Sequence, residues 1–443
     1  MSTALETPSI PKRRSPLDAE VALSTSNPAL DDIPELTRVP EICSRLEQTH
    51  AVGSASDAYD HTPNEVLGYA VKRLLRAMHD SALVRDVTNY DYQPYLYGAF
   101  NFLSYFRNAH GGVVQSASVS LPGAVARTMI ICCQEGAQNN AVRNAILNLF
   151  DDKGRVTVVG TRNGGFMRTP RKAVLHVPCP PDCDPTTLIL WALQEFNGAF
   201  GINMTQKSLG LVSGGQFPDA RVLCSMAIGG NFGAILISGI RAGDARSRRA
   251  KTFFAMLATV AQTTGVVILI LCTTGAATEI LAQGAVFNAL RTLGAYELLS
   301  AKTGSPYWLS VSNQAWRRYL APTYGAAVPG WFEGALWEKT QGLEDLVSLV
   351  CSWIANKVSD KSGMVLTREQ LDAFAGDALH LDVEYLDIIR QAARGKVSRS
   401  NIHRFADYLP CQWSRSLVRS NDKNADFICI APRGEDAQLG GAK

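Results

Sequence analysis

Four short, uninterrupted apolar runs recur along the middle of the chain and alternate with stretches of helical character. The apolar runs lie at residues 128–133, 173–178, 233–238 and 266–272, and the helical stretches at 140–150, 186–198 and 246–264. Strands that are apolar on both faces are typical of parallel sheets, because helices cover both sides of such sheets. The pattern therefore predicts an α/β fold with a parallel sheet flanked by helices.

The two ends of the chain differ from this middle part. The first 62 residues are rich in Pro, Ser, Thr and acidic residues and lack a periodic apolar face, which is typical of a flexible arm. Helical patterns return at 336–357, 367–378 and 382–393, and the last residues are basic and poorly patterned. We expect five regions: an N-terminal arm (1–62), a helical region (63–115), an α/β core (116–326), a helical lid (327–395) and a basic tail (396–443).

One uncharged stretch, Thr252 to Thr278, is long enough to cross a bilayer. Gln262, Gly265 and several threonines interrupt it, and its second half has the pattern of a buried strand, so we expect no membrane contact. The ten cysteines show no framework spacing. They are typical of reduced thiols in a cytoplasmic protein. The formal net charge of +3 over the whole chain implies no particular partner.

The first apolar run leads into a segment with the outline of a phosphate-binding loop. In such a loop, glycines allow the backbone N–H groups to approach the phosphates closely, a lysine neutralises the phosphates and a hydroxyl holds magnesium. In the frame Cys133 to Asn140, only Gly136 matches this pattern. Arg143, one turn into the following helix, is a candidate replacement cation, and the helix start could still offer N–H donors to an anion.

Two further strand ends belong to the same frame. The run at 233–238 ends in Ser238-Gly239, where an ATPase carries an acid that helps hold magnesium and a second acid that polarises water. The run at 266–272 ends at Thr273. The structural alternative is that residues 236–241 form an ordinary core strand of an unrelated α/β protein.

An ordered set of segments resembles the TnsC/TniB-type AAA+ ATPases that regulate target choice in bacterial DNA transposition. The matching segments are "PCPPDCD" (178–184), "LISGIR" (236–241), "QTTGVVILILCT" (262–273), "TQGLED" (340–345) and the Leu366-Thr367 pair. The resemblance covers roughly residues 110 to 395. It implies an AAA+-like P-loop NTPase core with a five-stranded parallel sheet, followed by a helical lid.

The chain departs from that family at the positions where the family has its phosphate-binding and magnesium-binding residues. Asn139 aligns with the loop lysine, Asn140 with the magnesium-binding hydroxyl, and Ser238 and Gly239 with the two acids. Both Walker motifs are therefore degenerate. Phosphoryl transfer depends on such groups for electrostatic stabilisation, so we expect no catalytic residue. We also expect no ATP or magnesium cofactor and no other metal. The resemblance leaves these remnants of a nucleotide pocket: Cys133, Gly136, Gln138, Asn139, Asn140, Arg143, Ser238, Gly239 and Thr273.

A dense basic cluster lies inside the predicted core, formed by Arg241, Arg246, Arg248, Arg249 and Lys251. Such a run is either the solvated face of a helix or a contact to DNA phosphates. The basic tail, which contains Tyr408 and Trp413, has the same two interpretations. Cys179 and Cys183 lie near His176, but the flanking prolines and the lack of a second ligand pair argue against a zinc site.

The resemblance therefore implies a pseudo-ATPase that acts as a DNA- or protein-binding assembly factor in transposition and target selection. The partners it implies are duplex DNA, a transposase, a target selector and an active AAA+ relative, within a homo- or hetero-oligomer in the bacterial cytoplasm. Two alternatives remain open. One is a divergent ATPase that is active only with a partner subunit, and the other is a protein-only regulatory module.

Overall fold

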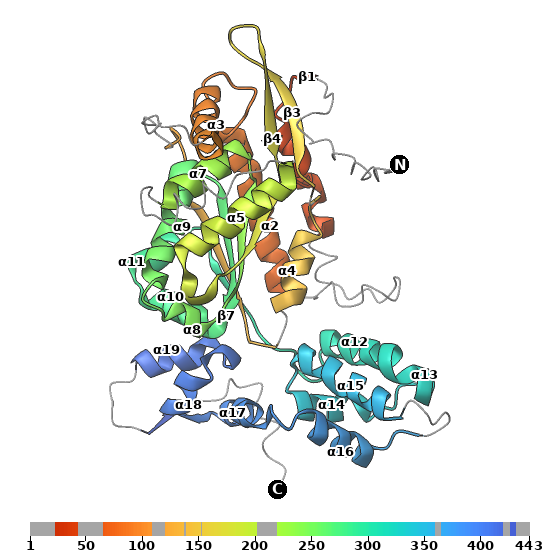
Figure 1. Cartoon of the computed structure of the whole chain (residues 1–443). Coiled ribbons are helices and arrows are strands. Elements are labelled where there is room, and N and C mark those ends of the chain that lie inside the picture. Colours follow the sequence, from red (N-terminus) through yellow and green to blue (C-terminus); the bar gives the residue numbers. More distant parts are fainter. Residues whose placement is uncertain are drawn as a thin grey trace, which may run out of the picture.

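The centre of the molecule is a five-stranded sheet in which all strand pairs are parallel (Figure 1). The computed structural model of the chain describes residues 23–42, 65–108, 120–136, 139–151, 153–201, 219–358, 365–419 and 426–430. The strands are β2 (Arg127–Cys133), β5 (Val174–Pro178), β6 (Ala234–Ile240), β7 (Val267–Thr273) and β8 (Ala295–Leu298), in the spatial order β5-β6-β7-β2-β8. The predicted α/β class is confirmed: a five-stranded parallel sheet is flanked by helices and followed by a helical region.

Two apolar cores lie on opposite faces of this sheet. Along β2, Ile130 and Cys132 join the core on one face, whereas Met129, Ile131 and Cys133 join the core on the other. The first core contains side chains from α5 (Pro185–Phe200), α7 (Asp219–Gly229), α9 (Ala250–Thr264), α10 (Thr274–Ala282) and α11 (Ala285–Ala289). The second contains side chains from α2 (Glu65–Val84) and α4 (Asn139–Leu147). Burial on both faces explains why the strands have continuous apolar sequences.

Two predicted helices differ in the structure. The helix expected at 246–264 begins only at Ala250, because residues 246–249 form a turn after the short helix α8 (Ala242–Ala245). The helix expected at 336–357 is two helices, α14 (Phe332–Thr340) and α15 (Glu344–Val358). Gln341 and Gly342 separate them, with φ of 54° and 75°, and a helix cannot continue through left-handed residues.

A β-hairpin that we did not predict from the sequence projects from the core (Figure 1). Its strands are β3 (Arg155–Gly160) and β4 (Phe166–Arg171), and β1 (Leu23–Ser24) pairs with β3 in parallel. The short 3-10 helices η2 (Pro28–Asp32) and η3 (Leu36–Arg38) follow β1, and α3 (Gln93–Asn108) follows α2. The expectation of a flexible arm is therefore wrong for residues 23–42, which dock on the hairpin and on α2.

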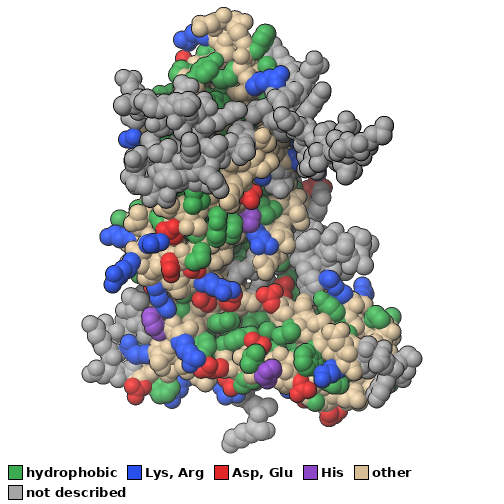
Figure 2. Space-filling view, in the orientation of Figure 1, with side chains coloured by type: hydrophobic (Ala, Val, Ile, Leu, Met, Phe, Trp, Pro, Cys, Tyr) green, Lys and Arg blue, Asp and Glu red, His purple; other side chains and the backbone are tan. Residues whose placement is uncertain are grey.

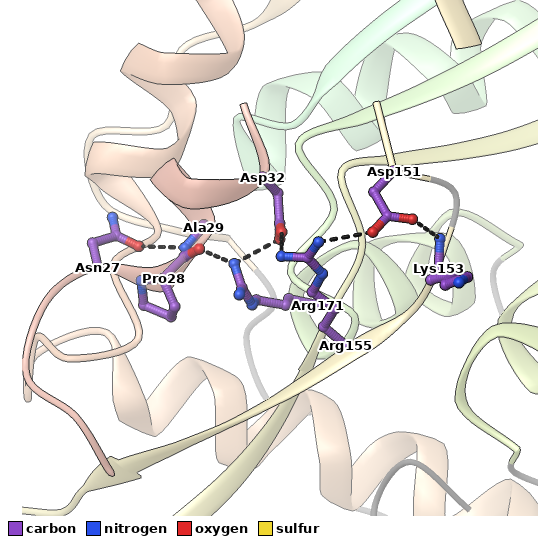
Figure 3. Close-up of polar contacts among 8 residues, drawn as sticks. All are labelled: Asn27, Pro28, Ala29, Asp32, Asp151, Lys153, Arg155 and Arg171. Atoms are coloured by element: carbon purple, nitrogen blue, oxygen red, sulfur yellow. Dashed lines mark hydrogen bonds and ion pairs between the residues drawn. The ribbon is translucent and has the colours of Figure 1, made fainter. Parts of the chain in front are cut away.

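A half-enclosed ion cluster attaches this N-terminal segment to the hairpin (Figure 3). The Asp32 carboxylate lies 2.8 Å from Arg171 and 3.4 Å from Arg155, and Arg171 also donates to the Pro28 carbonyl oxygen. The side chains of Asp32 and Arg171 are only 9% and 11% exposed, and burial raises the pKa of Asp32 although both arginines lower it. The ion cluster thus holds the N-terminal segment on the hairpin, although the Asp32 carboxylate is largely shielded from water.

Replacing Asp32 should release the N-terminal segment. We expect Asp32→Ala to lower the free energy of unfolding by about 2 kcal/mol, because Arg171 loses its charged partner in a poorly hydrated position. Asp31→Ala is the matched control, since Asp31 is the exposed neighbour and should change stability by less than about 0.5 kcal/mol. Urea unfolding measures both variants, and equal losses would contradict a specific role for Asp32.

The helical region after the sheet has its own apolar core. It comprises α12 (Pro306–Ala315), the π-helix η5 (Trp316–Leu320), α13 (Ala321–Tyr324), α14, α15, α16 (Arg368–Ala378) and α17 (Val383–Ala393). Trp308, Trp316 and Phe332 are completely buried in this core. No helix among the described residues is both long and apolar enough to span a bilayer, and the uncharged stretch 252–278 is divided between α9, β7 and α10.

The tail that we predicted to be poorly patterned is folded over 396–419 and 426–430. It forms β9 (Lys396–Ser398), α18 (Arg399–Arg404), η6 (Ala406–Tyr408), α19 (Cys411–Arg419) and β10 (Phe427–Cys429), which pairs antiparallel with β9. Val397, Ile402, Leu409 and Trp413 form its buried core. In Figure 1 this unit lies against the end of the core that carries α8 and α10.

Candidate functional site

The carboxyl ends of β2, β6 and β7 meet at one edge of the sheet, where open α/β folds bind their ligands. The predicted sequence of strand, loop and helix is present, with β2 leading through Gln134, Glu135 and Gly136 into α4. Gly136 has a φ of 77°, a conformation that favours glycine. Gln138 lies outside the described residues, and Asn139 and Asn140 are the first two residues of α4.

Two predicted pocket residues are directed elsewhere. Cys133 is buried in the core shared with α2 and α4, and burial, with a smaller effect of Glu344, raises the pKa of its thiol. Arg143 donates through two nitrogens to the side-chain oxygen of its neighbour Asn144, at 3.2 and 3.1 Å. In this structure Arg143 is therefore engaged on its own helix and does not take the place of the missing lysine.

The loop after β2 presents a carboxylate, Glu135, to the sheet edge. Glu135 forms a 2.6 Å ion pair with Arg241, which follows β6. Burial raises the pKa of Glu135, while Arg241 lowers it. The Arg241 guanidinium at this edge is thus already paired with a carboxylate of the loop itself.

The helical lid closes on the same loop. The backbone N–H of Asp345 donates to the Gly136 carbonyl oxygen at 3.1 Å, and a β-carbon added at Gly136 would lie 3.9 Å from Leu343. Burial raises the pKa of Asp345. The segment that resembles the family's lid motif is therefore in direct contact with the loop that resembles its phosphate-binding loop.

The end of β6 carries no acid. The Ser238 hydroxyl lies 2.8 Å from His176 Nε2 on β5, and the Ser238 carbonyl oxygen accepts from the Cys179 N–H at 2.7 Å. Gly239 has a φ of 82° and lies in a register irregularity between Ile237 and Ile240. Both predicted remnants thus lie at the sheet edge, but the contacts of Ser238 are to β5 and the turn after it.

An aspartate from the C-terminal unit fills the centre of this edge. The Asp407 carboxylate accepts from the Thr273 hydroxyl at the end of β7 and from the Ala242 N–H after β6, the latter at 3.0 Å. Its backbone oxygen accepts from the Glu135 N–H after β2 at 2.7 Å. One residue therefore joins the ends of three strands.

The residues around Asp407 extend this contact. Gln134 Nε2 donates to the Tyr408 carbonyl oxygen at 2.7 Å, and the Cys411 N–H donates to Glu297 on β8 at 2.7 Å. Gly275 lies so close that a β-carbon there would be 2.5 Å from the Asp407 carboxylate and 2.9 Å from backbone atoms. Glycine at 275 is thus required for the C-terminal unit to reach the sheet edge.

The predicted basic cluster is largely neutralised. Arg241 pairs with Glu135 at 2.6 Å, Arg246 with Glu279 at 2.7 Å and Arg249 with Asp184 at 2.7 Å. Arg248 and Lys251 are the exposed members without such an ion pair among the described residues. On the face seen in Figure 2, basic and acidic side chains are interspersed rather than gathered by sign.

Within the described ranges, no group of three or more His, Cys, Asp and Glu side chains is placed to hold a metal ion. The sequence did not indicate the role of Asp407, because this residue lies in the tail and is distant in sequence from the strands whose ends it joins.

Comparisons with known proteins give only distant likenesses. No family model matches the chain, and no curated protein matches it. A Walker-type ATPase of Pyrococcus abyssi shares 14% identity over 66% of this chain and 83% of its own, with a TM-score of 0.39. The ORC2 protein of Aeropyrum pernix, solved with ADPNP and ADP, shares 10% identity over 77% of this chain and 82% of its own, with a TM-score of 0.38. The sheet and its flanking helices, rather than these scores, define the fold class given above.

Proposed function

We propose that this chain is a pseudo-ATPase that acts as a DNA- or protein-binding assembly factor in DNA transposition and target selection. The observation that carries the proposal is the occupancy of the sheet edge by Asp407, which binds Thr273 and the Ala242 N–H. The order of TnsC/TniB-like segments along the chain supports the connection to transposition. The cytoplasmic, DNA-associated location follows from that connection.

The charges at this edge disfavour a nucleotide. Glu135 and Asp407 place two carboxyl groups near the loop, and Arg241 is already paired with Glu135. The phosphates of ATP would meet like charge without the loop lysine or a magnesium ligand to offset it. We therefore expect the core to hold one state whether or not nucleotide is present.

This fixed state suits a scaffold. In an active AAA+ protein, nucleotide links the core to the lid. Here protein groups make the links: Asp345 joins the lid to Gly136 of the core, and Asp407 joins the C-terminal unit to Glu135 of the core. A protein with such a core can still present surfaces to DNA, to a transposase, to a target selector or to an active AAA+ relative. We infer that it assembles as a homo- or hetero-oligomer without a nucleotide switch.

Binding of a labelled DNA duplex, with and without ATP and magnesium at two salt concentrations, tests this proposal. We expect binding that weakens with salt and ignores nucleotide, together with no ATP turnover by the pure protein. Turnover, or binding that requires ATP, would overturn the pseudo-ATPase assignment. Turnover only on mixing with an active relative would support the composite ATPase instead, and no DNA binding under any condition would support the protein-only module.

Arg248 and Lys251 are the cluster members that remain available to DNA phosphates. We expect Arg248→Ala with Lys251→Ala to weaken binding to all sequences alike and to reduce the slope of log K against log salt by about 1–2. Arg76→Ala with Arg221→Ala is the charge-matched control, because both residues are exposed on α2 and α7. Equal effects of the two double variants would assign the binding to general charge and not to this cluster.

A further inference from the structure

Two thiols face each other in the turn that follows β5. The sulfur atoms of Cys179 and Cys183 lie 3.7 Å apart, in van der Waals contact, and both cysteines are free. The turn contains the short 3-10 helix η4 (Pro181–Cys183) and leads directly into α5. This pair has no part in the contacts of Asp407.

The backbone holds Cys183 in a conformation that is uncommon for a cysteine. Asp182 and Cys183 have φ of 56° and 51°, in the left-handed region that favours glycine. Hydrogen bonds fix the turn: the Cys183 N–H donates to the Pro180 carbonyl oxygen at 3.1 Å, and the Asp182 N–H donates to Asp244 at 3.1 Å. The contact between the two sulfur atoms is thus set by the turn and not by freely rotating side chains.

The two sulfur atoms differ in access to solvent. Cys179 is partly exposed, whereas Cys183 is completely buried beneath it. A second pair, Cys132 and Cys411, has a similar sulfur separation of 3.9 Å, but both members are buried. Among the described residues, a small oxidant can therefore reach the Cys179–Cys183 pair but not the Cys132–Cys411 pair.

We propose that Cys179 and Cys183 form a reversible disulfide when a peroxide reaches Cys179. The Cys179 sulfur attacks one peroxide oxygen and the O–O bond breaks. Water is released, and Cys179 becomes a sulfenic acid. The Cys183 sulfur then attacks the Cys179 sulfur, the S–O bond breaks and a second water leaves. The two thiol hydrogens end in the two waters, so two thiols are oxidised as one peroxide is reduced.

The bridge requires only a short movement within the turn. The sulfur atoms would approach from 3.7 Å to a bonded separation of about 2 Å. The Cys183 thiol and burial raise the pKa of Cys179, so the reactive thiolate is scarce at neutral pH and the reaction should accelerate as the pH rises. The same turn carries Asp184, which pairs with Arg249 at 2.7 Å, and so the bridge would form next to the basic cluster.

Mass spectrometry of the whole chain after peroxide treatment tests this proposal. The experiment uses a variant with the substitutions Cys43→Ser and Cys429→Ser. Cys429 is exposed and would compete for peroxide, and Cys43 lies outside the described residues. The protein is treated with hydrogen peroxide, alkylated and digested. We expect the peptide containing Cys179 and Cys183 to be two hydrogen atoms lighter than the dithiol form and to carry no alkyl group. Alkylation of both cysteines should occur only after dithiothreitol is added. Cys132 and Cys411 should remain reduced in the folded protein and oxidise only in urea.

Three results would overturn the proposal. The first is a Cys179 that becomes oxidised while Cys183 is still alkylated as a free thiol. The second is a Cys132–Cys411 link that forms at the same rate as the proposed bridge, because access would then not select the pair. The third is a reaction that does not accelerate as the pH rises. Cys183→Ser provides the matched control, since Cys179 should then stop at the sulfenic acid and give no intramolecular link.

Discussion

Gly342→Ala is expected to lower the free energy of unfolding by about 4 kcal/mol. Gly342 has a φ of 75°, and a β-carbon there would lie 2.2 Å from the Ala301 carbonyl oxygen and 3.1 Å from its carbon. That oxygen accepts from the Trp337 indole at 2.9 Å and so cannot retreat easily. The substitution thus combines backbone strain with a collision against backbone atoms, in the segment that contacts the loop after β2.

Gly304→Ala separates the two contributions. Gly304 has a φ of 70° but no atom within 4 Å of an added β-carbon, so only backbone strain of about 1 kcal/mol is expected. Chemical denaturation of both variants, followed by far-UV circular dichroism, gives the difference, which measures the collision with Ala301. Equal losses would mean that the lid segment moves freely enough to absorb the extra carbon.

The central sheet was predictable because its strands are buried on both faces. Runs such as the one at 266–272 must be continuously apolar, and this signal survives in a single sequence. The resemblance implied a fifth strand, but the sequence did not locate it, because β8 is a short strand at the sheet edge with the sequence Ala-Tyr-Glu-Leu, whose first three side chains are not fully buried. The hairpin was missed for a similar reason, since β3 and β4 contain Arg155, Arg168 and Pro170 among their apolar residues.

The candidate site was predictable only in its local parts. The loop outline and Gly136 follow from the end of β2, and the absence of acids at Ser238 and Gly239 is directly visible in the sequence. Asp407 could not be inferred, because its partners Thr273 and Ala242 lie more than a hundred residues away in the chain and no periodic pattern marks the contact. The ion pairs of Arg241, Arg246 and Arg249 depend likewise on tertiary structure.

The folding of the tail shows the limit of periodicity as a signal. Residues 396–419 and 426–430 form elements of three to nine residues, too short to establish a clear repeat. Their core depends on a few large side chains, among them Trp413 and Phe405, which come together only in three dimensions. Trp413 is thus a core residue of the tail, and the contact of the basic tail with DNA or a partner stays a prediction.

Asp407→Ala is expected to lower the free energy of unfolding by about 3 kcal/mol, because it leaves two donors at the sheet edge without an acceptor. Those donors are the Thr273 hydroxyl and the Ala242 N–H, and both residues are at most 3% exposed. Asp407→Asn keeps an acceptor oxygen while removing the charge, so its cost should be nearer 1 kcal/mol. Urea unfolding of the two variants measures this order.

The same two variants separate a structural role of Asp407 from mere proximity. If the carboxylate holds the C-terminal unit on the core, Asp407→Ala should speed tryptic cleavage at Lys396 and Arg404, and Asp407→Asn should do so far less. Neither variant should gain ATP turnover, because Asn139, Asn140, Ser238 and Gly239 still lack the groups that phosphoryl transfer requires. Equal cleavage of both variants and the unmodified chain would mean that other contacts, such as those of Tyr408 with Gln134 and of Cys411 with Glu297, suffice to hold the unit on the core. Turnover in Asp407→Ala would show that the segment had been blocking a competent site.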